Sequence, residues 1–406
     1  MRIDLGLFIQ VFSLALLGGG RLVAGGGSSR ERLSSKGIAQ RIPDIEFTAQ
    51  GGGRIPQIGL GTAGTFNSSA ILSALKHGYR HIDTALLYGN QYAVNDAIRE
   101  SGIERENLWV TTKVGFFPKN LMLPIPPLLK ELLEDGQGYE RRNEKTREDL
   151  GVKLSLQQLG LSYADLCLVH SPLSTGIELW GSFYPHWGLG GEDTAERTGW
   201  KTWALNIITR YLVPFTSRSG YKYRMAAWKN LERMKEEGLC KYIGVSNYEV
   251  AMLKEMDSYA KIEPAVNQLE LHPLRQMREV QSYCQEKGIA VIGYGTEMLA
   301  NHTAIREIAH KHRSTPFQVI LRWRIQKGMV SIPRSTHWEH LRENLLVTNS
   351  NLLHLDRGDM EVLKALDEGR SFYWQTKNLE TGVVKASNST SKKRHGRQTK
   401  HREDEL

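Results

Sequence analysis

The segment Gly78–Ile98 reads GYRHIDTALLYGNQYAVNDAI and contains one complete strand–loop–helix unit. Its first part, His81–Ala85, is short and largely apolar, which is typical of a strand buried on both faces of a sheet. Its last part continues into Gln91–Glu100, whose apolar residues recur at helical spacing. Gly78 falls where a glycine ends the preceding helix. The segment therefore predicts a strand and a helix joined by a loop that carries Tyr88.

The same unit repeats from Ile45 to Arg370. Eight repeats predict a (β/α)8 barrel, a closed parallel sheet ringed by helices. A hairpin at Ile45–Ala49, turning through Gly51-Gly52-Gly53, would close its N-terminal end. The predicted strands are Ile55–Thr62, His81–Ala85, Leu108–Val114, Ala164–Ser171, Cys240–Asn247, Pro264–Leu271, Ala290–Thr296 and Met329–Ser335. The predicted helices are Ser68–His77, Gln91–Glu100, Glu144–Leu159, Met225–Glu237, Glu249–Tyr259, Gln276–Lys287, Thr303–Lys311 and Trp338–Leu346.

Two long stretches interrupt this rhythm. Residues 117–143 follow the third predicted strand and residues 173–224 follow the fourth, and both exceed ordinary connections in length. They therefore emerge at the C-terminal face, where barrel enzymes place their active sites. The second stretch is rich in tryptophan and tyrosine. We interpret these stretches either as insertions with a small core of their own or as a lid beside a substrate pocket.

The composition is that of a globular protein. Of 406 residues, 40% are hydrophobic and 24% are charged, which excludes disorder for most of the chain. Only one apolar run approaches the length of a bilayer span, which excludes a multi-span membrane protein. The net charge is +9, but much of the basic excess lies near the C-terminus, so we expect no nucleic-acid partner. Three cysteines exclude a disulfide-rich scaffold. We interpret Cys167, Cys240 and Cys284 as small buried residues, two of which could pair only at disulfide distance.

The N-terminal residues 1–24 have the layout of a signal peptide. Arg2 precedes the apolar run Leu5–Leu17, and small residues follow it. The run is short for a bilayer span, although an uncleaved anchor is the alternative. Residues 25–44 are rich in glycine, serine and arginine and are predicted to be a linker.

Residues 371–406 are predicted to form a disordered basic tail. The chain ends Glu403-Asp404-Glu405-Leu406, which resembles the retention signals of the endoplasmic reticulum except at its first position. We therefore expect the protein in the lumen of the endoplasmic reticulum, with secretion as the alternative. No membrane contact is expected beyond the signal peptide.

A glycine motif near the first predicted strand is also compatible with another fold. Gly59–Gly64 fits G-x-G-x-x-G, and Asp83 follows about 20 residues later, as in a dinucleotide-binding Rossmann unit. In that fold the helix begins inside the motif, so that its N-terminus meets the pyrophosphate. Here Phe66 and Asn67 intervene, and Asn67 is the better N-cap. We therefore do not favour the Rossmann interpretation.

Seven separated motifs point to one family. Besides Gly78–Ile98 they are TTK (Thr111–Lys113), LVHSP (Leu168–Pro172), GVSN (Gly244–Asn247), PAVNQLELHP (Pro264–Pro273), GYG (Gly293–Gly295) and IPRS (Ile332–Ser335). In this order they resemble the aldo-keto reductase superfamily over about 45–370, apart from the two insertions. The resemblance implies a (β/α)8 barrel that reduces aldehydes and ketones with NADPH and without a metal. It also implies a small-molecule carbonyl substrate and a monomer.

The resemblance implies a catalytic tetrad of Asp83, Tyr88, Lys113 and His170. Carbonyl reduction needs a proton donor, and a phenol with a pKa of about 10 is a poor acid at neutral pH. Lys113 nearby would lower the pKa of Tyr88, and Asp83 would hold the ammonium of Lys113. His170 would orient the substrate carbonyl and share the proton transfer.

The same resemblance implies the cofactor site. The nicotinamide carboxamide would be bound by Ser246, Asn247 and Gln268, and Tyr294 would stack on the nicotinamide ring. Gly61 and Thr62, at the end of the first strand, would lie close to the cofactor. The 2′-phosphate would be bound by Arg334 and Ser335, and the adenine would be contacted by Glu343 and Asn344. Stacking and amide hydrogen bonds would fix the orientation of the ring for hydride transfer. An arginine fork is well suited to bind phosphate.

Some positions depart from the family pattern. His340 stands where the family carries an arginine near the adenine, and Glu297 would place a negative charge near the phosphates. Ala63 and Ser171 replace aromatic pocket walls, so we expect a wider pocket there. These departures keep a second function open, a catalytically weak NADP(H)-binding sensor on the same barrel.

Overall fold

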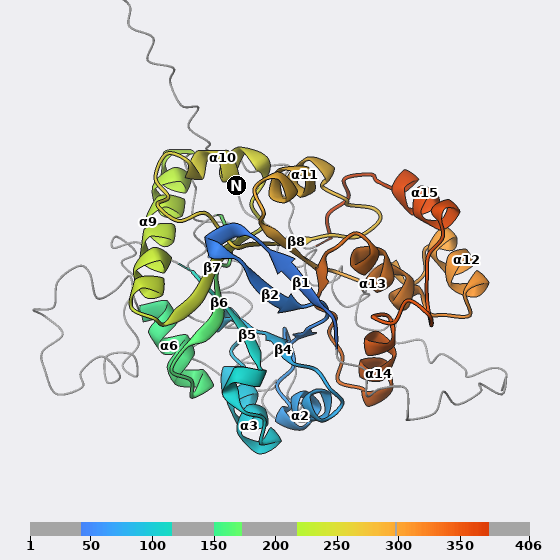
Figure 1. Ribbon diagram of the computed structural model, residues 1–406, viewed down its shortest axis with the longest axis horizontal. Coiled ribbons are helices and arrows are strands. Elements are labelled where there is room, and N and C mark those ends of the chain that lie inside the picture. Colours follow the sequence, from blue (N-terminus) through green and yellow to red (C-terminus); the bar gives the residue numbers. More distant parts are fainter. Residues whose placement is uncertain (1–41, 116–149, 173–216, 297–298, 373–406) are drawn as a thin grey trace, which may run out of the picture. The chain divides into compact units, whose positions relative to one another are not determined.

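The computed structural model describes residues 42–115, 150–172, 217–296 and 299–372 (Figure 1). The predicted signal peptide, most of the predicted linker and residues 117–143 lie outside the described residues, as do residues 173–216 and all but the start of the predicted tail. The predictions for those segments therefore stay predictions.

The central sheet is a closed barrel of parallel strands. Its strands follow one another in sequence order, with β3 and β10 at the two ends of that order. The residues just before β3 are also hydrogen-bonded to β10, which closes the barrel. The amide of Gly59 donates to the carbonyl oxygen of Ser331 at 2.9 Å, and the amide of Ser331 donates to the carbonyl oxygen of Gln57 at 2.9 Å. The strands are β3 (Leu60–Gly61), β4 (His81–Asp83), β5 (Trp109–Val114), β6 (Ala164–Val169), β7 (Cys240–Ser246), β8 (Val266–Glu270), β9 (Ala290–Tyr294) and β10 (Val330–Ser331).

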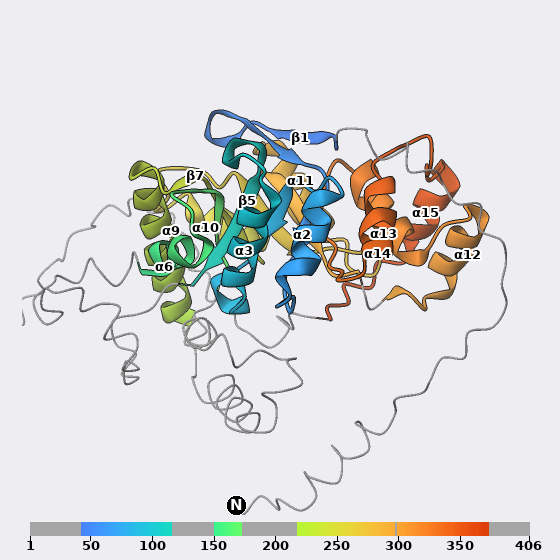
Figure 2. The same ribbon diagram turned by 90° about the horizontal axis from the view of Figure 1, so that it is seen from below.

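Helices surround this sheet on its outer side (Figures 1 and 2). The predicted (β/α)8 barrel is therefore confirmed. The helices are α2 (Ser68–Lys76), α3 (Gln91–Ser101), α6 (Leu150–Leu159), α9 (Ser217–Glu236), α10 (Val250–Met256), α11 (Arg278–Glu286), α12 (Thr303–Lys311), α13 (Pro316–Gln326), α14 (Trp338–Leu346) and α15 (Arg357–Ala365).

A hairpin of β1 (Asp44–Phe47) and β2 (Gly53–Pro56) lies across the N-terminal end of the barrel, as predicted (Figure 2). It is anchored by a cluster of three aromatic rings. The ring centroids of Phe47 and Tyr242 are 5.0 Å apart, and those of Tyr242 and Trp109 are 5.7 Å apart. The hydroxyl of Tyr242 donates to the carbonyl oxygen of Gly52 at 3.0 Å. The hairpin and these rings therefore cover the N-terminal end of the barrel.

One predicted strand is divided in the structure, and two helices were not predicted. The predicted strand Ile55–Thr62 is divided between β2 and β3, because its middle joins β10 by a single bridge at Ile58. Helices α13 and α15 were not predicted. Both begin with a capping box, at Thr315 and at Asp356, and this local signal was present in the sequence.

Helix α9 begins at Ser217, earlier than the predicted Met225, so residues 217–224 belong to the barrel and not to the second insertion. A buried ion pair joins this part of α9 to α10. Arg224 donates to both carboxylate oxygens of Glu255, at 2.7 and 2.8 Å, and both side chains are fully buried. A bidentate pair of this kind holds the first turns of α9 against α10.

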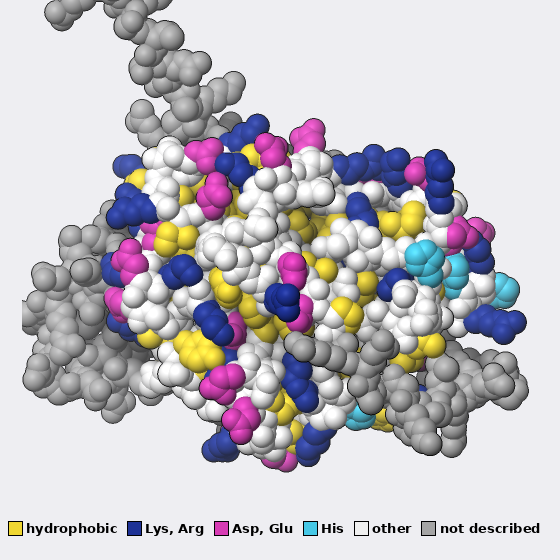
Figure 3. Space-filling model, in the orientation of Figure 1, with side chains coloured by type: hydrophobic (Ala, Val, Ile, Leu, Met, Phe, Trp, Pro, Cys, Tyr) yellow, Lys and Arg dark blue, Asp and Glu magenta, His cyan; other side chains and the backbone are white. Residues whose placement is uncertain are grey.

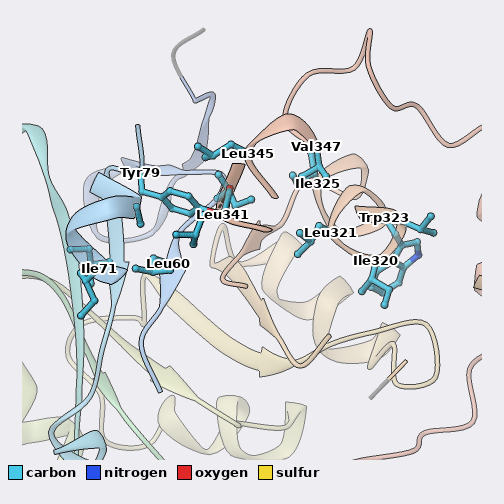
Figure 4. Packing of buried hydrophobic residues seen from close by; sticks show 14 of the residues in the cluster. Leu60, Ile71, Tyr79, Ile320, Leu321, Trp323, Ile325, Leu341, Leu345 and Val347 are labelled. Carbon is cyan, nitrogen blue, oxygen red and sulfur yellow. Dashed lines mark hydrogen bonds between the residues drawn. The ribbon is translucent and has the colours of Figure 1, made fainter. Parts of the chain in front are cut away.

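Apolar side chains fill the space between the barrel and its helices (Figure 4). Leu60 of β3 and Ile71 of α2 pack toward Tyr79, whose hydroxyl donates to the carbonyl oxygen of Leu341 in α14 at 3.0 Å. Leu321 of α13 belongs to the same cluster. This cluster joins α2 to α13 and α14.

Charges of both signs are mixed over the face that carries the hairpin (Figure 3). Among the described helices, none combines the length and the apolar character that a bilayer span requires. No group of three histidine, cysteine, aspartate or glutamate side chains suited to a metal ion occurs in the described part of the chain.

All three cysteines are buried, as expected, but two of them are bonded. Cys167 of β6 and Cys240 of β7 form a disulfide with a Cα–Cα distance of 5.8 Å, and Cys284 is a free thiol. The predicted burial is therefore confirmed for all three, and the pairing that the sequence left open is formed by Cys167 and Cys240. The sequence could not reveal the bond, because it depends on the approach of two strands that lie 73 residues apart.

Unfolding the protein without reductant should expose one reactive thiol, and unfolding it with reductant should expose three. Replacing Cys167 and Cys240 together by alanine should lower the free energy of unfolding by about 4 kcal/mol, since the bond closes a long loop in the unfolded chain. Thiol titration and urea denaturation check both. Cys284→Ala serves as the control and should leave a disulfide-bonded chain with no reactive thiol. Three thiols without reductant would contradict the bond.

Candidate active site

A lysine, a carboxylate and a phenol meet at the C-terminal end of the barrel. Lys113 Nζ donates to Asp83 Oδ1, to the carbonyl oxygen of Thr84 at 3.0 Å and to Tyr88 Oη at 3.2 Å. The second oxygen of Asp83 accepts from Gln268 Nε2 at 2.7 Å. The side chains of Asp83 and Lys113 are almost wholly buried, at 2% and 1% exposed. The ammonium is therefore fixed between a counterion and the phenol.

The barrel explains why these residues meet. Asp83 is the last residue of β4 and Lys113 lies near the end of the neighbouring strand β5. Adjacent parallel strands end at the same face, so both side chains reach the same place. Tyr88 closes the 3-10 turn Leu86–Tyr88, whose backbone ends at Gly89 in the left-handed region, with φ of 64°. That turn returns the phenol over the strand ends.

Burial and charge act against each other at Lys113 and Tyr88. Burial lowers the pKa of Lys113, but Asp83 and Tyr88 raise it more, so the net shift is upward and Lys113 stays cationic. Burial raises the pKa of Tyr88, and Lys113 lowers it by a smaller amount. Lys113 therefore acts on the pKa of Tyr88 in the expected direction, but burial outweighs it and the net shift is upward. Tyr88 is protonated at neutral pH and has a proton to donate.

His170 follows β6 and faces the same phenol. The ring centroids of His170 and Tyr88 are 5.8 Å apart in an edge-to-face arrangement. Burial, with a further contribution from Lys113, lowers the pKa of His170 to about 3. The imidazole is therefore neutral at pH 7, and it can form hydrogen bonds to a carbonyl group without adding a charge.

A second group of polar side chains adjoins this tetrad. Tyr294 Oη donates to Asn247 Oδ1 at 2.7 Å, and Asn247 Nδ2 donates to Ser246 Oγ at 3.1 Å and to the carbonyl oxygen of His170 at 3.1 Å. Ser246 Oγ in turn donates to the carbonyl oxygen of Gln268 at 2.9 Å. Asn247 adopts a positive φ of 64°, which asparagine tolerates better than most residues. The chain of bonds ties the ends of β7, β8 and β9 together.

Both groups line one cavity of about 240 Å³. Its walls include most of the residues predicted from the sequence, and Lys113 lies directly behind Asp83 and Tyr88. Ala63 lines it as the sequence suggested, whereas Ser171 is fully buried and is not among its walls. The lining residues are Gly61, Ala63, Asp83, Tyr88, His170, Ser246, Asn247, Gln268, Tyr294, Gly295, Thr296, Ile332 and Arg334.

Four predicted cofactor residues lie outside this lining. Thr62 is fully buried, and its hydroxyl donates to the carbonyl oxygen of Asp83 at 3.0 Å. Ser335 accepts from the amide of His337 at 3.1 Å, next to Arg334 at the rim. Glu343 and Asn344 lie on α14, and Asn344 is buried. The contact of Thr62 with Asp83 was not revealed by the sequence.

Arg334 lies at the rim of the cavity and donates from Nη1 to the carbonyl oxygen of Ala63 at 2.8 Å. Ile332 in the wall was not singled out from the sequence, although it belongs to the IPRS motif. Glu297, the expected negative charge near the phosphates, lies outside the described residues.

Comparison with known proteins agrees with this geometry. The model of the "Aldo/keto reductase family" matches residues 57–301, which span the tetrad and the polar group around Tyr294. The chain belongs to the aldo/keto reductase family. It is thus a member of a family of oxidoreductases that act on carbonyl compounds.

The regions that align with this chain cover most of the length of its curated relatives. A 9,11-endoperoxide prostaglandin H2 reductase of Trypanosoma cruzi is 34% identical over 78% of this chain and 88% of its own. A glyoxal reductase of Bacillus subtilis is 29% identical over 78% of this chain and 91% of its own.

Solved structures share the fold. An aldo/keto reductase from Brucella melitensis is 27% identical, covers 80% of this chain and 100% of its own, and superposes with a TM-score of 0.57. An aldo-keto reductase of Bombyx mori in complex with NADP, 23% identical, covers 84% of this chain and 97% of its own with a TM-score of 0.60.

Proposed function

We propose that this protein reduces an aldehyde or ketone to an alcohol with NADPH, and that Tyr88 donates the proton. One observation carries the proposal. Lys113 Nζ contacts both Asp83 and Tyr88 Oη beneath a cavity that the phenol lines. A buried cation next to a phenol is the arrangement that stabilises a phenolate when the proton leaves.

The residues divide the work as follows. A carbonyl oxygen at the cavity floor would accept hydrogen bonds from Tyr88 and from the neutral imidazole of His170. Tyr88 releases its proton to that oxygen, and Lys113 stabilises the resulting tyrosinate at a distance of 3.2 Å. Asp83 keeps the ammonium in place and offsets its burial. NADPH, when bound, supplies the hydride.

The cavity suits a nicotinamide ring. An aromatic face, Tyr294, and carboxamide-binding side chains, Asn247 and Ser246, line one wall, with the guanidinium of Arg334 at the rim. Aromatic faces stack on flat rings and arginine pairs with phosphate. A Bombyx mori structure with NADP and a yeast glycerol 2-dehydrogenase (NADP(+)) of 29% identity support NADPH as the cofactor.

The test is the consumption of NADPH by the purified full chain. Glyoxal, glyceraldehyde and benzaldehyde form the first panel, because one relative is a glyoxal reductase and the others differ from glyoxal in size and polarity. We expect saturable oxidation of NADPH with at least one of them. Tight binding of NADPH with no turnover across a widened panel would favour the sensor, and no binding would refute the cofactor.

We also propose that the chain resides in the secretory pathway, in the lumen of the endoplasmic reticulum. The predicted signal peptide and the C-terminal Glu403–Leu406 motivate this compartment. The disulfide of Cys167 and Cys240 supports it, since disulfides persist in oxidising compartments and are rare in the cytosol. Immunolocalisation of the native chain with a luminal marker tests it, and a cytosolic distribution would refute it.

A further inference from the structure

Helix α13 carries a buried arginine that reaches the end of the barrel next to the cavity. Arg324 is fully buried, with no exposed surface. The helix that holds it is fixed at its start by the capping box of Thr315 and Gln318. A charged side chain is rarely buried this completely unless hydrogen bonds satisfy it, so its partners indicate its purpose.

The partners of Arg324 are backbone carbonyl oxygens at or just beyond the ends of β8 and β9 and the hydroxyl of Ser331 in β10. Its guanidinium donates to oxygens at the ends of β8, β9 and β10. The bonds join Nε to Leu271 O at 2.7 Å, Nη1 to Gly293 O at 3.1 Å and to Ser331 Oγ at 3.2 Å, and Nη2 to Leu271 O, to Tyr294 O at 2.8 Å and to Gly295 O at 2.7 Å.

Two of those partners line the cavity. Tyr294 and Gly295 form part of its wall, and the hydroxyl of Tyr294 is itself bonded to Asn247. The phenol ring is thus held at its outer end by Asn247 and at its backbone by Arg324. Gly293 completes the fit, because a Cβ there would lie 2.8 Å from Arg324 Cδ. Strand β9 can pass over the guanidinium only with glycine at this position.

We infer that Arg324 is a positioning residue that sets the place of the Tyr294 ring, and thereby the orientation of the nicotinamide against the carbonyl group. This rests on the proposed function. A planar fork with several donors fixes both distance and angle, and charged donors form the stronger hydrogen bonds. A reacting ring is held in productive geometry only when the residues around it are themselves held.

The same helix offers a matched control. Arg322 is also buried, at 5% exposed, but it faces away from the cavity. Its Nη1 donates to the carbonyl oxygen of Val347 at 3.0 Å and its Nε to Gln326 Oε1 at 2.9 Å. Substituting Arg322 therefore removes a buried guanidinium from α13 without touching β9.

The experiment compares Arg324→Gln and Arg324→Lys with Arg322→Gln and Arg322→Lys in the full chain. The readouts are the melting temperature, the Kd of NADPH, and kcat per folded molecule with NADPH and with NADPH deuterated at C4. We expect the Arg324 variants to lose at least about tenfold in kcat and to show a larger deuterium isotope effect, because hydride transfer becomes limiting when its geometry is loosened. The Arg322 variants should melt earlier but keep kcat and the isotope effect.

Equal kcat, isotope effect and Kd in wild type and in folded Arg324 variants would overturn the inference. So would an equal loss in the Arg322 variants, which would make the effect one of stability alone. If Arg324→Gln does not fold, the same measurements are made on Arg324→Lys, which keeps the positive charge. A wild-type chain that fails to bind NADPH would refute the proposed function, and this inference would fall with it for that separate reason.

Discussion

Replacing Tyr88 by phenylalanine should lower kcat for carbonyl reduction by about 10²- to 10⁴-fold, the usual contribution of a positioned general acid. The substitution removes only the hydroxyl. The ring keeps its edge-to-face contact with His170, and Lys113 keeps Asp83 and the carbonyl oxygen of Thr84 as partners. The fold and the affinity for NADPH should therefore change little. Steady-state kinetics and titration of NADPH binding measure the two effects separately.

Tyr92→Phe is the matched control for this prediction. Tyr92 lies on α3, four residues further along the chain, and its side chain is 48% exposed. It should retain wild-type turnover. If Tyr88→Phe retained more than about a tenth of wild-type kcat, the proton would have to come from another group, and His170 would be the first candidate.

The sequence predicted the barrel because its evidence is local and repeated. A buried strand such as His81–Ala85 and a helix such as Gln91–Glu100 can each be recognised from a short window, and the repetition predicts closure. The tetrad was implied by the resemblance to the aldo-keto reductases, and the predicted barrel agrees with it because its members lie at or after the ends of three neighbouring strands. The splitting of Ile55–Thr62 could not be predicted, since the pairing of Ile58 with Ser331 depends on the other end of the chain.

Contacts between residues that lie far apart in the chain could not be predicted from the sequence. Three such contacts are the disulfide of Cys167 with Cys240, the ion pair of Arg224 with Glu255, and the hydrogen bonds of Arg324 to β9. The sign of the net pKa shift of Tyr88 could not be predicted from the sequence for a related reason. Its sign depends on how deeply the phenol is buried relative to its contact with Lys113, and a motif records neither quantity.

The pair of Asp83 and Lys113 allows stability and catalysis to be separated. Lys113→Met would leave the carboxylate of Asp83 buried without its cation. Removing one partner of a buried ion pair typically costs about 3–5 kcal/mol, so the free energy of unfolding should fall by that amount. Its remaining side-chain bond, from Gln268 Nε2, does not neutralise the charge. Urea denaturation measures the loss.

The double variant Asp83→Asn/Lys113→Met should recover most of that stability, because it removes the buried charge together with its partner. Its turnover should stay as low as that of Lys113→Met, since neither variant can stabilise a tyrosinate at Tyr88. Recovery of stability without recovery of kcat would show that the ion pair serves the phenol and not the fold. If the double variant regained turnover, Lys113 would not be needed to stabilise the phenolate, and the role given to Tyr88 as proton donor would have to be revised.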